Sequence, residues 1–433
     1  MTPSTELTID SWRVLSLAQR VEAFKGLPPG LDDEFFLSLT AREQSQLVLA
    51  LPEPERRLWV RLLAPDDAAD LIQASSNPER ESLIRYLDVS TMREVTALLA
   101  YAEDDAGGLM STRFARIRPE MTIDEAIAYL RRQAGQVETI YYAYVLDQEQ
   151  RLLGVASFRD LFSADRNKRV DEVMRKRYIA VGEETDQEDV ARIFEEHGLL
   201  AVPVVDEQGH MKGLVTVDDI VDVVEEEASE DIQRIGGMQA LEAPYMATKF
   251  GELVRKRAGW LAILFVGEML TATAMARYEG EIARAVVLAV FIPLIISSGG
   301  NSGSQATTLV IRAMALGEVH LRDWWRVVRR EFLTGLVLGG ILALIGLCRI
   351  LLWQAIGGTY GEHYLKIGVT VALSLLGVVL FGTMAGSMLP FILKRAGLDP
   401  ASASAPFVAT LVDVTGLVIY FSVAAAVLRG TLL

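Results

Sequence analysis

Five apolar segments of membrane-spanning length follow one another in the C-terminal part of the chain, and they constrain its fold more than any other feature. About 20 apolar residues cross the hydrocarbon core as a helix, which satisfies all of its own backbone hydrogen bonds there. We therefore predict a five-helix α transmembrane domain over residues 257–433, with spans near 258–277, 285–311, 332–353, 367–393 and 403–428.

Charge divides the same chain into two halves. Residues 1–256 carry 48 acids and 29 bases, whereas residues 257–433 carry 9 acids and 13 bases. The acidic half is expected to be soluble, to attract cations and to repel nucleic acid. Residues 1–25 have no apolar signal core, so no secretory signal is predicted. The single cysteine, Cys348, excludes an intrachain disulfide.

The distribution of bases in the loops predicts the orientation. Lys and Arg gather before the first span, between the second and third, and between the fourth and fifth. Because such loops usually face the cytoplasm, we predict a multi-pass protein of the cell (inner) membrane, surrounded by lipid. The soluble N-terminal half is then cytoplasmic, and the C-terminus lies outside.

One carboxylate lies deep in the last span. Asp413 is the only charged residue between Ala403 and Leu428, and a charge at that depth costs about 2.5–3.5 kcal/mol. It is either a cation site in a membrane pathway or a protonated contact between helices. Glu268, in the first span, is a further intramembrane acid and a candidate accessory residue of that pathway.

The second span carries an unusual polar motif between Pro293 and Gln305. Its three glycines, at 299, 300 and 303, weaken a helix, and six serine or amide side chains accompany them. Small residues let helices pack closely, and polar ones bond between helices. The alternative is a pore-lining segment whose oxygens face water or a hydrated ion.

An internal repeat occupies the second part of the soluble half. Four residues recur 59 positions later, because Asp147, Gly154, Ser157 and Asp160 correspond to Asp206, Gly213, Thr216 and Asp219. Each copy is predicted as helix, strand, turn, strand and helix, with the first helices near 122–134 and 185–197. This α/β pattern resembles a tandem pair of CBS (cystathionine-β-synthase) domains, which we place at 111–168 and 169–228.

Each repeat contains a hydroxyl-x-x-Asp motif, namely Ser157 with Asp160 and Thr216 with Asp219. Both motifs are typical of helix caps, in which the hydroxyl accepts from free backbone amides. In CBS pairs the same motif often holds an adenosine ribose. The resemblance therefore also permits a site for ATP or another adenine nucleotide.

Residues 1–110 are predicted to form an all-α N-terminal domain. Four prolines, Pro52, Pro54, Pro65 and Pro78, lie where helices would begin. Apolar residues recur at helical spacing, among them Leu58, Leu62, Leu71, Ile72, Leu83 and Leu87. This domain by itself reveals no chemistry.

Eight acids and no base lie in the fourteen residues 218–231. Acids four apart on a helix repel one another, and a divalent cation would remove the repulsion. Oxygen-only ligands favour Mg²⁺ or Ca²⁺ over zinc. The alternative is a solvated acidic helix.

The order of these parts resembles the MgtE family of Mg²⁺ channels or transporters. The matching motifs are Gly299-Gly-Asn-x-Gly-x-Gln305, Pro406-x-x-x-Thr410-x-x-Asp413-x-x-Gly416 and Ala106-Gly-Gly-Leu-Met110. The resemblance implies a homodimer with its pore on the two-fold axis, and cytosolic Mg²⁺ sites that hold it closed. It also implies that one long connecting ("plug") helix fills residues 229–256.

The resemblance also implies which residues bind Mg²⁺. Asp413 would be the pore residue, Asn301 lies in the matching second-span motif, and Asp399 would join a gate site. The soluble ligands would be Glu34, Asp66, Asp70, Asp219, Asp222, Glu227, Glu230 and Asp231, with a backbone carbonyl from Gly108. Asp67 could replace Asp66. His197-Gly198 stands where the family often has an acid, so one cytosolic site is expected to be weak or absent.

These features together predict a Mg²⁺-selective importer that cytosolic Mg²⁺ closes. Two alternatives remain: an ion-coupled secondary transporter of another divalent metal, and a membrane-tethered CBS nucleotide sensor. An enzyme is not predicted, because the sequence contains no nucleophile–base pair, no P-loop and no zinc motif.

Overall fold

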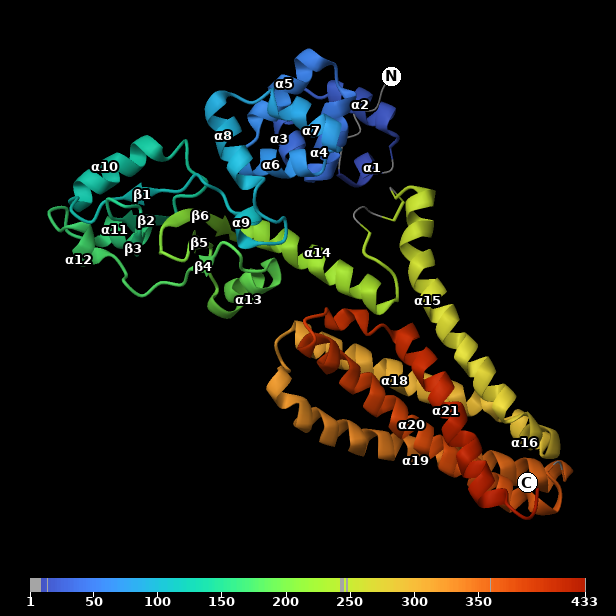
Figure 1. The fold of residues 1–433 in the computed structure, drawn as a ribbon. Helices are drawn as coiled ribbons and strands as arrows, with labels where there is room; N and C mark the ends of the chain where they lie inside the picture. Colours follow the sequence, from blue (N-terminus) through green and yellow to red (C-terminus); the bar gives the residue numbers. More distant parts are fainter. Residues whose placement is uncertain (1–8, 14, 242–244, 247, 359, 433) are drawn as a thin grey trace. The chain divides into compact units, whose positions relative to one another are not determined.

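The chain divides into two compact units, Met1–Glu227 and Ala228–Leu433, in the computed structural model (Figure 1). The structure describes residues 9–13, 15–241, 245–246, 248–358 and 360–432. Each unit contains apolar cores of its own, so each is described by itself.

Short helices form the N-terminal part of the first unit: α1 Ile9–Arg13, α2 Leu17–Lys25, α3 Leu31–Leu37, α4 Ala41–Ala50, α5 Glu53–Leu62, α6 Pro65–Gln73, α7 Asn77–Ile84 and α8 Val89–Leu98. The four prolines lie at helix starts, as predicted. Aromatic rings fill the core, where the ring centroids of Phe24 and Trp59 lie 4.8 Å apart. Two of the apolar residues that recur at helical spacing, Leu58 and Leu62, lie outside this core. Leu58 is 66% exposed, because α5 buries Trp59 and Val60 instead.

The two repeats form two sheets of identical topology. Each first strand pairs parallel with the second, and each second strand pairs antiparallel with the third. The elements are α9 Ala106–Leu109, β1 Arg116–Ile117, α10 Ile123–Gln133, β2 Tyr142–Leu146, β3 Leu152–Ser157, α11 Phe158–Ser163, α12 Val170–Val173, β4 Val181–Gly182, α13 Gln187–His197, β5 Ala201–Val205 and β6 Met211–Thr216. The predicted helix, strand, turn, strand and helix order is therefore confirmed in both repeats. The two-residue strands β1 and β4 were not predicted.

The connection to the membrane helices differs from the prediction. A single helix over 229–256 is wrong, because α14, Val217–Ile235, ends at a pair of glycines and α15 begins only at Phe250. Gly237 has a φ of +73°, a left-handed conformation that ends a helix and that other residues rarely adopt. The first span accordingly begins as part of α15 rather than after a separate connecting helix.

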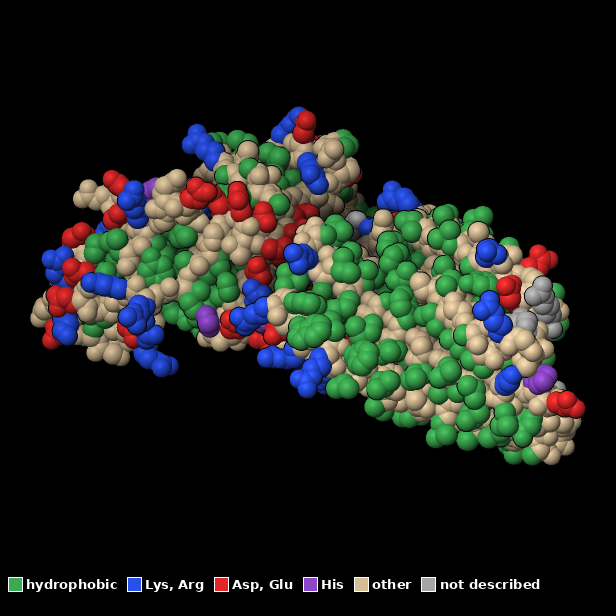
Figure 2. Space-filling model, turned by 60° about the horizontal axis from the view of Figure 1, so that its bottom comes forward, with side chains coloured by type: hydrophobic (Ala, Val, Ile, Leu, Met, Phe, Trp, Pro, Cys, Tyr) green, Lys and Arg blue, Asp and Glu red, His purple; other side chains and the backbone are tan. Residues whose placement is uncertain are grey.

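Five helices in the described part of the second unit are long and apolar enough to cross a membrane, which confirms the predicted number. The elements are α15 Phe250–Arg277, α16 Glu279–Arg284, α17 Val286–Ala289, α18 Ile292–Ala315, η1 Leu321–Asp323, α19 Trp324–Gly357, η2 Gly361–His363, α20 Tyr364–Arg395, η3 Pro400–Ser402 and α21 Ala405–Leu428. Figure 2 shows apolar side chains covering much of the visible face of these helices, as a lipid environment requires.

Glycines let α18 approach α20 closely. A Cβ atom on Gly299 would lie 2.4 Å from Val378 Cγ1, and one on Gly386 would meet the Gly303 carbonyl oxygen at 2.2 Å. The Thr307 hydroxyl donates to the Gly386 carbonyl at 2.9 Å. The glycines of the second-span motif therefore serve helix packing, which was one of the two interpretations of that motif.

Candidate cation sites

Helices α15 and α21 run side by side in the same direction, and aromatic contacts at both ends set their register. Trp260 Nε1 donates to Ser404 Oγ at 3.1 Å near the start of both helices. Near their other ends, the rings of Tyr278 and Phe421 stack at 4.7 Å. Asp413 and Glu268 lie midway between these contacts, where their carboxyl groups are close enough to interact electrostatically.

The second-span motif presents two different faces along α18. Its glycines are buried, whereas Ser297, Asn301 and Gln305 are exposed at successive four-residue steps. We call these three residues the polar stripe of α18. The Ser304 hydroxyl donates to the Ala405 carbonyl at 3.2 Å, and a Cβ on Gly300 would lie 3.6 Å from Ala409. Because α18 and α21 run in opposite directions, the next turn brings Ser297 level with Asp413.

Asp399, the expected gate-site residue, and Glu230, one of the ligands expected in the soluble half, are joined by an arginine. The Arg234 guanidinium pairs with the carboxylates of Glu230 and Asp399. Asp399 also accepts from the Ala401 backbone N–H at 2.8 Å and so caps η3. These two acids are therefore brought together, but with a side-chain cation between them.

A cluster of acids forms within the first unit, where α6 meets the repeats. We call it the α6 acid cluster; it comprises Asp66, Asp67, Asp70, Glu138 and Asp219. The Ser111 hydroxyl donates to Glu138 at 3.3 Å and also bonds Asp66. Asp66 Oδ1 is buried and finds no hydrogen-bond partner among the described residues, which leaves an acceptor available for a ligand.

Electrostatics explains why this cluster would take up a cation. Burial first, and then the charges of Asp67 and Asp66, raise the pKa of Asp70 to about 8. Burial, followed by repulsion from neighbouring acids, likewise raises the pKa of Glu138 to about 7. Although protein surrounds them on most sides, the side chains of Asp67 and Asp70 still reach solvent at the edge of the cluster, so water and ions screen part of the repulsion and can enter.

The remaining expected ligands do not converge. Glu34 is exposed in the first turn of α3, and Asp222 is exposed on α14. Glu227 accepts a 2.5 Å hydrogen bond from Gln187 of α13, and Asp231 is half-buried on α14. A Cβ on Gly108 would lie 2.2 Å from the Ala102 carbonyl oxygen, so only glycine fits there.

No three His, Cys, Asp or Glu side chains within the described ranges are placed closely enough to hold one ion. The expected metal-ligand sets therefore stay predictions. The structure brings several of their members into electrostatic contact without closing them around an ion.

The two hydroxyl-x-x-Asp motifs cap helices or turns in the structure. Ser157 Oγ accepts from the Asp160 backbone N–H at 3.1 Å, and Thr216 Oγ1 donates to Asp219 at 2.6 Å. Asp160 accepts two bonds, at 3.0 and 3.1 Å, from the Arg175 guanidinium. The interpretation of these motifs as caps is thus confirmed, whereas nucleotide binding stays a prediction.

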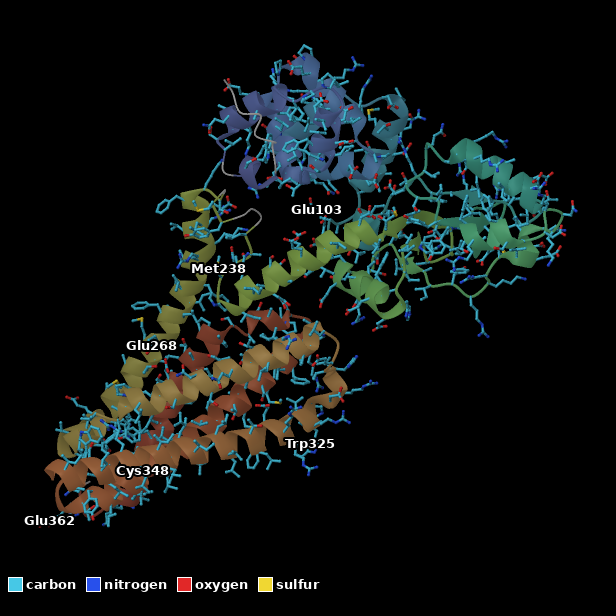
Figure 3. The ribbon with its side chains drawn as sticks, turned by 180° about the vertical axis from the view of Figure 1, so that it is seen from behind. Glu103, Met238, Glu268, Trp325, Cys348 and Glu362 are labelled. Atoms are coloured by element: carbon cyan, nitrogen blue, oxygen red, sulfur yellow. The ribbon has the colours of Figure 1, made fainter. Side chains whose placement is uncertain are left out.

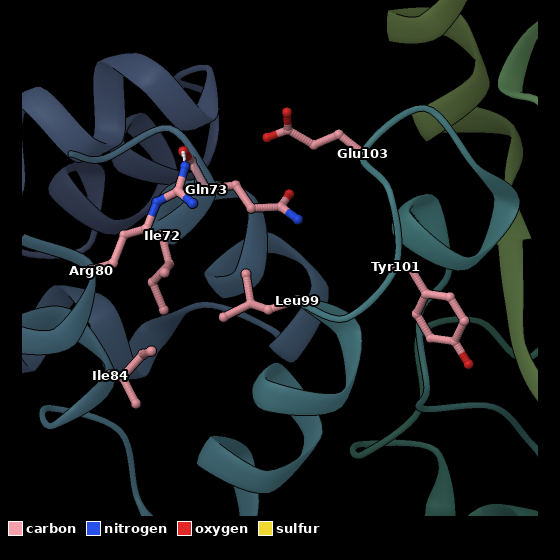
Figure 4. A pocket seen from close by; sticks show the side chains of 7 residues that line it. All are labelled: Ile72, Gln73, Arg80, Ile84, Leu99, Tyr101 and Glu103. Atoms are coloured by element: carbon pink, nitrogen blue, oxygen red, sulfur yellow. Dashed lines mark hydrogen bonds between the residues drawn. The ribbon is translucent and has the colours of Figure 1, made fainter. Parts of the chain in front are cut away.

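A separate hollow of about 300 Å³ lies in the helical N-terminal part. Figure 4 shows its lining residues, Ile72, Gln73, Arg80, Ile84, Leu99, Tyr101 and Glu103. Two of its polar side chains already have partners, since Arg80 donates to the Ser75 carbonyl at 2.9 Å and Tyr101 donates to Glu183 at 2.8 Å. It contains none of the predicted site residues.

Two residues of these sites, Glu138 and Arg234, were not predicted from the sequence. Glu138 precedes the second strand of the first repeat and joins the α6 acid cluster only through the fold. Arg234 had a local signal, because it lies four residues after Glu230 and is the only base in α14. That spacing favours an ion pair on one helix face.

Similarity to known proteins extends over nearly the whole chain. Residues 7–104 match the MgtE intracellular N domain, residues 106–167 and 170–226 match CBS domains, and residues 292–423 match a divalent cation transporter family, also called MgtE. The chain is 39% identical to the magnesium transporter MgtE of Thermus thermophilus, over 97% of this chain and 92% of that protein.

Two further relatives are similar in sequence. The magnesium transporter MgtE of Enterococcus faecalis is 36% identical over 92% of this chain and 93% of its own length. Among solved structures, the cytosolic domain of the Mg²⁺ channel MgtE in complex with ATP is 42% identical, with a TM-score of 0.46, and covers 49% of this chain and 87% of that one. On the full-length similarity and the family matches, the chain belongs to the MgtE family of magnesium transporters, multi-pass membrane proteins with a soluble N-terminal part.

Proposed function

We propose that two copies of this chain form a Mg²⁺ pathway on a two-fold axis, lined by Asp413 and the polar stripe of α18. One observation carries the proposal: Ser297, Asn301 and Gln305 are exposed on α18 while the glycines of the same motif are buried. Amide and hydroxyl groups are costly against lipid. A water-filled path or a second copy of the chain would satisfy them.

The chemistry of Asp413 suits such a path. Mg²⁺ loses its waters reluctantly and usually binds through one or two carboxylates. A two-fold axis would set two Asp413 side chains opposite each other, so a hydrated ion could be held by both. Binding through water is strong enough to admit the ion and weak enough to release it.

The soluble half would supply the gate. Mg²⁺ at the α6 acid cluster would relieve the repulsion among its carboxylates and hold the first unit in its compact form. Driving a two-state gate from mostly open to mostly closed takes about 5.5 kcal/mol of differential binding, which several weak sites could supply together. The concentration of Lys and Arg in alternate loops further supports a cytoplasmic soluble half and a C-terminus on the outer side of the membrane.

The test is Mg²⁺ uptake by the full chain in proteoliposomes, with Mg²⁺ varied on the soluble-domain side. Asp413→Asn should abolish or strongly reduce uptake while leaving the elution volume and stability of the protein unchanged. Glu331→Gln, which removes a carboxylate from α19 instead, should transport normally. Wild-type uptake by a well-folded Asp413→Asn protein would refute the pathway. Uptake that requires a Na⁺ or H⁺ gradient would point to a secondary transporter instead.

A further inference from the structure

A second carboxylate lies beside Asp413, contributed by a helix to which the proposed pathway assigns no role. Glu268 lies on α15 (Figure 3), and its carboxyl group is close enough to the Asp413 carboxyl, across the α15–α21 contact, for the two to interact electrostatically. The two residues are 145 positions apart in sequence, so only the packing of these helices brings them together.

The register of the two helices supports this contact independently. A Cβ on Gly267 would lie 2.9 Å from Thr410 Cγ2, so the residue next to Gly267 is level with the turn of α21 that contains Asp413. The Trp260–Ser404 bond and the Tyr278–Phe421 stack hold the same register on either side. The position of the acid pair is therefore set by three contacts along one helix–helix seam.

No base compensates these acids within their own helices. Between Arg257 and Arg277, α15 contains no Lys or Arg, and α21 contains none at all. Two neighbouring carboxylates repel each other when both are charged. A divalent cation would neutralise both, whereas a monovalent cation would neutralise only one.

A buried hydroxyl in the same seam indicates room for a further ligand atom. Thr271 is 8% exposed and is the only buried residue of α15, and its Oγ1 has no hydrogen-bond partner among the described residues. It lies one helical turn beyond Glu268 on α15, level with Asp413. Other threonines of these helices bond back to the carbonyl four residues earlier, as Thr273 does to Met269 at 3.0 Å and Thr410 does to Pro406 at 3.0 Å.

We propose that Glu268 is a second carboxylate ligand of the ion at Asp413, with Thr271 Oγ1 accepting from a water of the hydrated ion. The pair sets the preference of the site for divalent over monovalent cations. This inference rests on the proposed function, because it requires that Mg²⁺ passes Asp413. It adds one acid from α15 to each half of the pathway.

The test measures the rate of uptake against external Mg²⁺, and Na⁺ uptake under the same conditions, for full-length protein in proteoliposomes. Glu268→Gln keeps the size and hydrogen-bonding capacity of the side chain but removes its charge. We expect the half-saturating Mg²⁺ concentration to rise roughly tenfold, since affinity for such cations follows the charge count of the ligands. Na⁺ uptake relative to Mg²⁺ uptake should increase. Glu268→Asp should recover part of both properties.

Two controls keep the outcome interpretable. Glu331→Gln makes the same charge change in α19 and should stay within about twofold of wild type. Thr271→Val removes only the hydroxyl, and it should raise the half-saturating concentration by roughly threefold, the loss of one water-mediated hydrogen bond. The inference would be overturned if Glu268→Gln had the same half-saturating Mg²⁺ concentration and the same ion preference as Glu331→Gln. If Glu268→Gln fails to fold, a Thr271→Val protein with the half-saturating concentration of wild type would overturn it instead. If Asp413→Asn also transports normally, the proposed pathway itself has failed. If Asp413→Asn is inactive, only the role of Glu268 has failed.

Discussion

The guanidinium of Arg234 pairs with the carboxylate of Asp399, which joins the last turn of α14 to the turn that precedes α21. The same guanidinium pairs with Glu230. A Mg²⁺ ion that uses both carboxylates must therefore displace a cation that belongs to the chain itself. Arg234 is thus placed to set the Mg²⁺ concentration at which such a gate responds.

Removal of this internal competitor should sensitise the transporter to cytosolic Mg²⁺. For Arg234→Ala, we expect half-inhibition of uptake at a concentration roughly fivefold lower, which corresponds to about 1 kcal/mol. Inhibition curves with Mg²⁺ varied on the soluble-domain side measure it. Arg85→Ala, which changes an exposed arginine of the N-terminal part, is the matched control. A curve shifted to higher Mg²⁺ would show that Arg234 assists closure rather than competing with Mg²⁺.

The α6 acid cluster predicts how stability depends on pH. In the folded chain the pKa is about 6 for Asp67, about 7 for Asp219 and about 8 for Asp70, because burial raises each one first and neighbouring acids add to it. Unfolded carboxyls titrate near about 4, so the folded state binds more protons between these values. The stability that these groups contribute is present below pH 4 and is lost as pH rises to about 8.

Mg²⁺ should restore the stability that is lost at high pH, because it supplies positive charge to the carboxylates of the α6 acid cluster after they have lost their protons. Without Mg²⁺, thermal unfolding of the full chain should give a Tm that is a few degrees lower at pH 8 than at pH 5.5. Each kcal/mol lost from the free energy of unfolding lowers Tm by about 2–4 °C. Millimolar Mg²⁺ should raise Tm more at pH 8 than at pH 5.5, and should protect residues 200–256 from proteolysis. Asp70→Asn should flatten both effects, whereas the exposed Glu81→Gln should not. Equal stabilisation at both pH values would exclude these carboxylates as the Mg²⁺ site.

The two faces of α18 should respond differently to mutation. A Cβ at Gly303 would lie 2.8 Å from Val408 Cγ1 and 3.0 Å from the Gly382 carbonyl oxygen, so Gly303→Ala should cost about 1–3 kcal/mol of stability. Asn301→Ala, on the exposed polar stripe, should leave Tm unchanged but reduce Mg²⁺ uptake. Unfolding scans and uptake assays on both proteins separate these effects. A large loss of stability in Asn301→Ala would place its amide in helix packing instead.

Nucleotide binding can be tested at the first repeat. We expect ATP to bind the full chain and Asp160→Asn to weaken binding by roughly tenfold, about 1.4 kcal/mol, because the charge and one of the two acceptor oxygens for the ribose hydroxyls would be lost. Titration calorimetry measures this effect. The change also removes the ion pair with Arg175, which is largely exposed and contributes at most about 1 kcal/mol to stability. Glu172→Gln, on the exposed side of α12, serves as the control. Equal heats for all three proteins would leave Ser157 and Asp160 with a capping role alone.

The features that sequence alone determined are those set by local periodicity and local chemistry. Apolar length specified the five membrane helices, the repeat at Asp147 and Asp206 specified two copies of one fold, and prolines marked helix starts at Pro52 and Pro65. Each can be recognised along the chain, without knowing which distant segments meet in space. The break at Gly236 and Gly237 was equally local, and the prediction of a continuous helix there overlooked it.

Tertiary structure alone decided which distant charges meet. Glu268 lies near Asp413 because α15 and α21 pack in parallel register, Asp66 approaches Asp219 because α6 lies against the repeats, and Asp399 meets Arg234 across 165 residues. Electrostatic interaction acts through space, so sequence separation carries no information about it. The two faces of α18 show the same division: the motif was visible in the sequence, but only packing against α20 and α21 determined that its glycines face inward and Asn301 outward.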